Sequence, residues 1–103
     1  MFFDKRRYIV NISGGKGSIN TDRLRGMVAH FVVRPKSELT IWSLDVLDKE
    51  SDEMREIKNH VGRLDDFNGI TLGKDDQELV TLRFYDVSSN EPIKVIFKIR
   101  EIE

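Results

Sequence analysis

Alternation of apolar and polar residues with a period of two is the feature that most restricts what this chain can fold into. Near the C-terminus, Ile93, Val95, Phe97 and Ile99 alternate with three residues of which two are lysines. This pattern is typical of a strand with one buried and one exposed face. Runs of strand length recur along the chain, at residues 6–12, 27–33, 39–47 and 79–87.

Two segments fit either a strand or a helix. A helix over residues 21–31 would carry Gly26 in its middle, at a cost of about 1 kcal/mol relative to Ala, so a strand over 27–33 is favoured. Residues 54–61 follow a polar turn at 48–52. We expect a strand there as well, because the turn joins two runs of strand length in the manner of a hairpin, and a short helix is the alternative.

The predicted strands are spaced at roughly 8–14 residues, which indicates a β-sandwich or a small barrel. We predict an all-β fold, an antiparallel β-sandwich that is jelly-roll-like, with six to eight short strands and little or no helix. A length of 103 residues fits a single domain over 1–103. Residues 1–5 are interpreted as an extended N-terminal arm, and residues 13–18 as a flexible glycine-rich loop.

Composition removes several classes of function. The chain has no cysteine, which excludes disulfides, thiolate metal sites and cysteine nucleophiles. No apolar run approaches the roughly 20 residues of a membrane span, so no membrane partner is expected. The glycines at 14–17 lack the spacing of a phosphate-binding loop, and no nucleophile-elbow motif is present. We therefore expect no enzymatic activity, no catalytic residues, no cofactor and no metal.

Charge is divided unevenly along the sequence. The totals are 17 basic and 18 acidic residues, a net charge of −1. Residues 1–37 hold eight basic and two acidic residues, whereas residues 38–78 hold five basic and twelve acidic ones. Such a division indicates either internal pairing or two complementary surfaces that meet in an assembly.

For the second case, we expect head-to-tail contacts between copies, in which basic residues of the N-terminal third face acidic residues within 45–66 of a neighbour. The candidates combine terminal aromatic, basic and acidic side chains. The possible assembly contacts are Phe2, Phe3, Arg6, Arg7, Arg23, Arg25, Asp48, Asp52, Asp65 and Asp66.

Two runs, GMVAHFVVRP at 26–35 and TIWSLDVLD at 40–48, resemble the small β-sandwich virion structural proteins of tailed bacteriophages. The resemblance extends over 26–102, although residues 49–52 replace the Asp-Gly type of turn that such proteins show. It implies a structural subunit without catalytic residues that serves as capsid decoration, head–tail connector or tail component. Its partners would be other virion proteins and itself, and it would be located in the virion after assembly in the host cytoplasm.

Two other functions remain open. A single-stranded nucleic-acid-binding β-barrel module would use the basic N-terminal third with its neighbouring aromatic residues. The acidic middle of the chain and a pI of 6.1 argue against nucleic acid as a partner. A calcium-dependent ligand-binding β-sandwich would instead pool carboxylates from two loops. Its candidate ligands are Asp45, Asp48, Asp52, Asp65 and Asp66.

Overall fold

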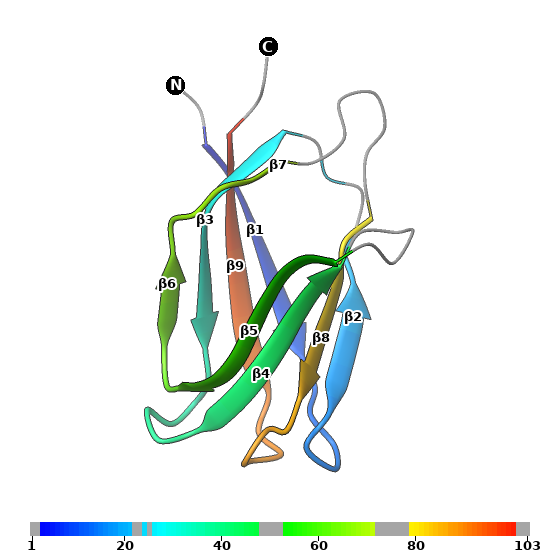
Figure 1. Ribbon diagram of the computed structural model, residues 1–103, viewed down its shortest axis with the longest axis vertical. Helices are drawn as coiled ribbons and strands as arrows, with labels where there is room; N and C mark the ends of the chain where they lie inside the picture. The colour runs from blue at the N-terminus through cyan, green and yellow to red at the C-terminus, as the bar shows by residue number, and fades with distance from the viewer. Residues whose placement is uncertain (1–2, 22–23, 25, 48–52, 72–78, 101–103) are drawn as a thin grey trace.

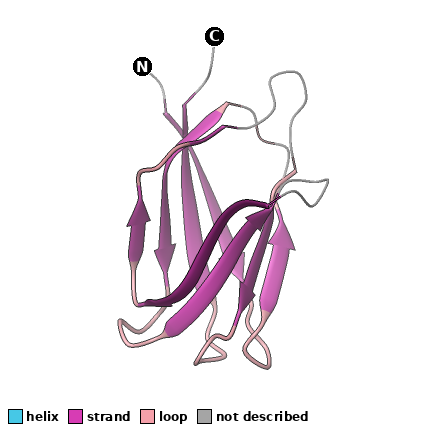
Figure 2. Cartoon of the chain, viewed as in Figure 1, coloured by secondary structure: helices cyan, strands magenta, loops and turns pink. Residues whose placement is uncertain are grey.

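The computed structural model describes residues 3–21, 24, 26–47, 53–71 and 79–100. These residues contain nine strands and, in the described ranges, no helix (Figure 2). Consequently they include no helix long and apolar enough to cross a membrane. The strands are β1 (Phe3–Val10), β2 (Gly17–Asn20), β3 (Met27–Arg34), β4 (Ile41–Leu47), β5 (Glu53–Val61), β6 (Leu64–Asp66), β7 (Ile70–Thr71), β8 (Thr81–Tyr85) and β9 (Ile93–Arg100).

The strands form two antiparallel sheets that face each other (Figure 1). The first sheet has the order β1-β9-β3-β6, with β7 also paired to β3, and the second has the order β2-β8-β4-β5. The predicted all-β sandwich is therefore confirmed. Both ambiguous segments are strands, β3 and β5, and Gly26 before β3 has a φ of 110°, outside any right-handed helix.

The connectivity is that of a jelly roll. Strand β1 pairs with β9, β2 with β8, β3 with β6 and β4 with β5, so the chain forms one long two-stranded ribbon. The ribbon folds over so that β9 also pairs with β3, and β8 with β4. This wrapping puts the two halves of the ribbon into two facing sheets. The number of strands is one above the expected range because two short strands, β6 and β7, both pair with β3.

The core lies between the sheets and follows the alternation in the sequence. Trp42 of β4 is fully buried, and its ring meets that of Phe84 edge-on at 5.7 Å between centroids. Phe31 and Phe97 form a similar pair in the first sheet, at 6.0 Å. Such pairs add about 0.5–1.5 kcal/mol beyond the burial of their area. Removing one of these rings is expected to cost about 3–5 kcal/mol.

The N-terminal expectations need two corrections. Residues 3–5 are not an arm, because they begin β1 and pair with β9, with Phe3 opposite Arg100. The glycine-rich segment is shorter than predicted, since Ser13 and Lys16 close a tight turn and β2 already starts at Gly17. A Cβ at Gly17 would overlap the carbonyl oxygen of Asn11, so this glycine permits two chain segments to approach closely.

Candidate functional site

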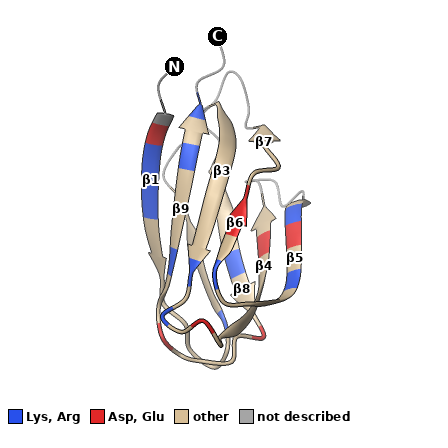
Figure 3. Ribbon diagram, turned by 90° about the vertical axis from the view of Figure 1, so that its left-hand side faces the viewer, with Lys and Arg blue, Asp and Glu red and all other residues tan. Residues whose placement is uncertain are grey.

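The outer surface of the first sheet is lined by basic side chains. In β9, the residues that alternate with the buried Val95, Phe97 and Ile99 point outward and include two lysines and an arginine. In β1, the outward positions are those that alternate with the buried Val10. Figure 3 shows the resulting basic segments of β1 and β9. We define the basic face as Lys5, Arg7, Arg34, Lys94, Lys98 and Arg100.

Strand register places like charges side by side on this face. Lys5 is directly opposite Lys98, and Lys94 is directly opposite Arg34. Like charges in such positions destabilise a sheet. Among the residues that the structure describes, no carboxylate forms an ion pair with any member of the basic face. The positive charge of the face is therefore not neutralised by these residues.

One end of the basic face opens into a shallow hollow of about 300 Å³. Ile9, which is 61% exposed, contributes an apolar side chain to it. The remaining lining consists of two prolines and three cationic side chains, namely Pro35, Pro92, Arg34, Lys36 and Lys94. A hollow with this lining suits a group that combines a negative charge with an apolar body.

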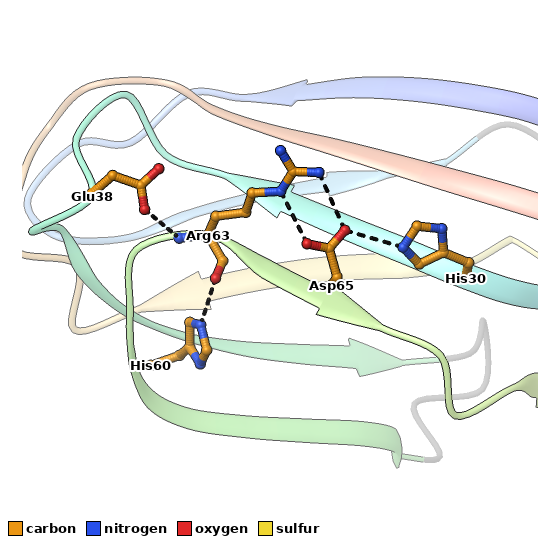
Figure 4. Close-up of polar contacts among 5 residues, drawn as sticks. All are labelled: His30, Glu38, His60, Arg63 and Asp65. Atoms are coloured by element: carbon orange, nitrogen blue, oxygen red, sulfur yellow. Dashed lines mark hydrogen bonds and ion pairs between the residues drawn. The ribbon is translucent and has the colours of Figure 1, made fainter.

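At the edge of the first sheet, two rings stack on each other. The imidazole of His30 lies 4.1 Å from the ring of Phe67, with an angle of 5° between the planes. His30 Nε2 is 3.2 Å from Asp65 Oδ1, and this contact holds the imidazole (Figure 4). His30 is directly opposite Lys98 in the register, so the ring pair adjoins the basic face. Phe67 remains 71% exposed.

The acidic residues of this region already have partners in the same chain. Asp65 accepts hydrogen bonds from Arg63 Nε at 3.0 Å and Nη2 at 3.3 Å. These bonds hold the pKa of Asp65 below its ordinary value of 3.8, against a smaller effect of desolvation, and His30 adds to them. Asp66 accepts from Arg55 Nη1 at 2.8 Å, and Asp45 from Arg83.

The described carboxylates among those proposed for calcium, Asp45, Asp65 and Asp66, are thus divided among separate ion pairs, and Asp48 and Asp52 lie outside the described residues. Asp45 lies in β4 and forms an ion pair with Arg83, whereas Asp65 and Asp66 lie in β6 of the other sheet. Among the described residues, no group of three or more His, Cys, Asp and Glu side chains could hold a metal ion.

A rigid turn joins β5 to β6 and supports an apolar surface. Gly62 has a φ of 74°, and its carbonyl oxygen accepts a hydrogen bond from Trp42 Nε1 at 2.8 Å. His60 Nε2 donates to Arg63 O at 3.0 Å, and Arg63 N donates to a Glu38 carboxylate oxygen at 3.5 Å (Figure 4). The turn thereby ties β4, β5 and the segment before β4 together.

Beside this turn, three large aliphatic side chains are exposed. Ile41 lies directly opposite Val61, and Leu39 is two residues before Ile41. Their exposed fractions are 82% for Leu39, 43% for Ile41 and 54% for Val61. We call these three residues the apolar corner.

Only part of the predicted contact set can be placed. Arg7 belongs to the basic face. Arg6 pairs with Asp4 at 2.9 Å, and alternation puts both on the other side of β1. Phe3 lies in β1 opposite Arg100. Five predicted residues fall outside the described ranges: Phe2, Arg23, Arg25, Asp48 and Asp52.

Sequence reasoning missed the contribution of β9 to the basic face. The alternation at 93–99 already put Lys94 and Lys98 on one side of a strand. What it did not show is that this strand pairs with β1, which brings Lys98 opposite Lys5. The apolar corner was missed because Ile41 and Val61 are 20 positions apart and meet only through the β4–β5 register.

Comparison of the chain with protein-family models, with curated proteins and with solved structures finds no match.

Proposed function

We propose that this protein is a non-enzymatic structural component of a tailed-bacteriophage particle, as capsid decoration, head–tail connector or tail component. It would act through assembly contacts with other virion proteins and with itself. The observation that carries the proposal is the apolar corner, in which the exposed Ile41 and Val61 are directly paired and the exposed Leu39 lies in the turn before β4 of a small jelly roll. The resemblance of residues 26–102 to virion proteins points to the same class.

Single exposed apolar residues are common on protein surfaces, whereas adjoining ones mark a site of association. Directly paired residues such as Ile41 and Val61 have Cβ atoms about 4.5–5.5 Å apart, so their side chains form one surface. Burying Leu39, which is 82% exposed, in a partner would contribute about 1–2 kcal/mol.

The corner is also well ordered before any partner arrives. Gly62 sits close against Glu38, and Trp42 and His60 hold the carbonyl groups of Gly62 and Arg63. A surface that is already rigid loses little conformational entropy when it associates. This favours the corner as the assembly contact over charge pairing with residues 45–66, because four acids of that region, Asp45, Glu56, Asp65 and Asp66, have cationic partners already.

The proposal is tested on particles produced by cells whose viral genome encodes this chain. Purified particles should contain the chain, as detected by mass spectrometry. The variant Leu39→Asp should fold but be lost from particles, because a carboxylate would have to be buried without a partner. Leu79→Asp is the matched control, since Leu79 is also an exposed leucine and lies outside the corner.

Two results would contradict the proposal. One is a wild-type chain that is absent from particles, and the other is Leu39→Asp incorporated as well as Leu79→Asp. Melting curves of both variants establish that loss from particles reflects assembly rather than unfolding.

A further inference from the structure

We propose that the basic face, together with the stacked rings of His30 and Phe67, binds single-stranded nucleic acid. Phosphates would lie on the lysines and arginines, and one base would stack on the exposed side of Phe67. This inference goes beyond the structural role proposed above and does not depend on the apolar corner.

The first argument is the unneutralised charge. The two directly opposed cation pairs, Lys5 with Lys98 and Lys94 with Arg34, each destabilise the sheet. On the second sheet, cations do have carboxylate partners, for example Lys58 with Glu56 at 3.0 Å. The unneutralised charge is therefore a property of one sheet, and an anionic partner would remove the repulsion.

The second argument is the arrangement of the cations. Successive outward residues on one strand, such as Lys98 and Arg100, are about 6.6 Å apart, and neighbouring strands are separated by about 4.8 Å. Between Lys98 and Lys94, which are about 13 Å apart along β9, the outward residue is Ile96, and Arg7 of β1 lies directly opposite it, so the cations continue through Arg7 to Lys94 and the hollow that Lys94 lines. This forms a continuous path that a flexible phosphodiester strand can follow.

The third argument is the exposed aromatic ring beside this path. One side of Phe67 is occupied by His30, and the side chain is still 71% exposed, so its other side is open. Stacking on a base would strengthen binding by about 5- to 150-fold. An acidic protein surface would satisfy the lysines but would gain nothing specific from an open aromatic ring next to them. The combination of a basic surface with a stacking ring therefore favours nucleic acid.

A pI of 6.1 was the main sequence argument against this partner. The structure separates the charges that this value averages. Asp65 and Asp66 are bound to Arg63 and Arg55, so their charges are compensated locally. Attraction of a polyanion depends on the local field at the surface it meets rather than on the net charge.

The test is fluorescence anisotropy of a labelled oligothymidylate of about 12 nucleotides, within the range that one oligonucleotide-binding domain covers. We expect binding at low salt that weakens steeply as salt rises, with a slope of about −0.7 per phosphate contact. Lys98→Gln should reduce the slope by about one contact. Phe67→Ala should weaken binding by about 5- to 150-fold, the equivalent of one lost stacking contact.

Two control variants distinguish binding at the proposed site from nonspecific electrostatic attraction between the protein and the oligonucleotide. Lys58→Gln removes a lysine from the other sheet, and Leu39→Ala shortens an exposed apolar side chain outside the basic face. Neither should change the affinity by more than about twofold, because neither contacts the strand. Unlabelled polyglutamate should compete poorly at equal charge concentration.

Three outcomes overturn the inference. The first is absence of binding by the wild-type chain at low salt. The second is equal loss in Lys98→Gln and Lys58→Gln. The third is binding that Phe67→Ala leaves unchanged and polyglutamate displaces fully, which would identify the basic face as a docking surface for an acidic protein. Particle incorporation is read separately through Leu39→Asp, so a failure of either proposal is recognised on its own.

Discussion

Replacing Gly62 with Ala tests how the β5–β6 turn is held. Gly62 has a φ of 74°, a conformation that a side chain disfavours. A Cβ added there would lie 2.6 Å from the main-chain oxygen of Glu38 and 3.0 Å from its carboxylate. The carboxylate can rotate away, but the main-chain oxygen cannot move unless the turn before β4 moves with it.

The expected loss has two parts. The left-handed conformation costs about 1–2 kcal/mol for a residue with a Cβ. Displacing the turn also strains the hydrogen bond from Trp42 Nε1 to Gly62 O, and loss of a buried bond of this kind costs about 1–3 kcal/mol. The sum is about 2–5 kcal/mol, which corresponds to a fall in melting temperature of about 8 °C or more for a domain of this size.

The measurement is urea unfolding followed by tryptophan fluorescence, because Trp42 is the single tryptophan and is fully buried. Gly14→Ala is the matched control: Gly14 has a φ of 61°, and a Cβ there would have nothing within 4 Å. It should lose only the conformational part. If Gly62→Ala costs no more than Gly14→Ala, the close approach to Glu38 has no energetic weight and the reasoning is refuted.

Three further predictions concern charged and ionisable side chains. The hydrogen bonds from Arg63 lower the pKa of Asp65, so its stabilisation is complete above about pH 4 and is lost as pH falls through the lowered folded-state pKa. Asp65→Asn should therefore flatten the acid side of the stability profile, and unchanged urea midpoints between about pH 3 and 5 would contradict this. Burial and then the charge of Asp45 raise the pKa of Tyr85 above its ordinary 10.0, so folding loses stability as pH rises past that value. Asp45→Asn should lower the tyrosinate transition seen by ultraviolet absorbance, and a higher transition would refute the assignment. Lys98→Gln should raise the free energy of unfolding by about 0.2–1 kcal/mol by removing a cross-strand repulsion, and a lower urea midpoint would show that the repulsion is not felt.

The strands that were predicted correctly are those in which every second residue is apolar and points into the core. Ile93, Val95, Phe97 and Ile99 point inward, as their spacing indicates. Strand β6 is not among the predicted runs, because its inward Asp66 is a buried carboxylate neutralised by Arg55. A partner 11 positions away in sequence cannot be identified from local pattern, so an acidic strand is indistinguishable from an acidic loop.

The charged surface could not be predicted from the sequence, because a surface combines residues of neighbouring strands that can lie far apart along the chain. The count along the chain placed the positive charge at residues 1–37 and found four acidic and four basic residues in 79–103. Pairing of β1 with β9 brings Lys5 and Arg7 of the first segment beside Lys94, Lys98 and Arg100 of the last on one side of the sheet. Only the strand order, which the sequence pattern does not contain, reveals that arrangement.

The position of β9 has a consequence for how the chain reaches its folded state. It is the last of the described strands to be synthesised, yet it lies between β1 and β3 and is the sole described strand that pairs with β1. Until residue 100 has emerged, β1 and β3 have no neighbour to join them, and the first sheet cannot form. Closure of the sandwich must therefore follow synthesis of β9, and contacts between residues so distant in sequence make folding slow. A ribosome-stalled chain that ends before Ile93 should accordingly remain open to proteases along β1, whose described pairing partner is absent.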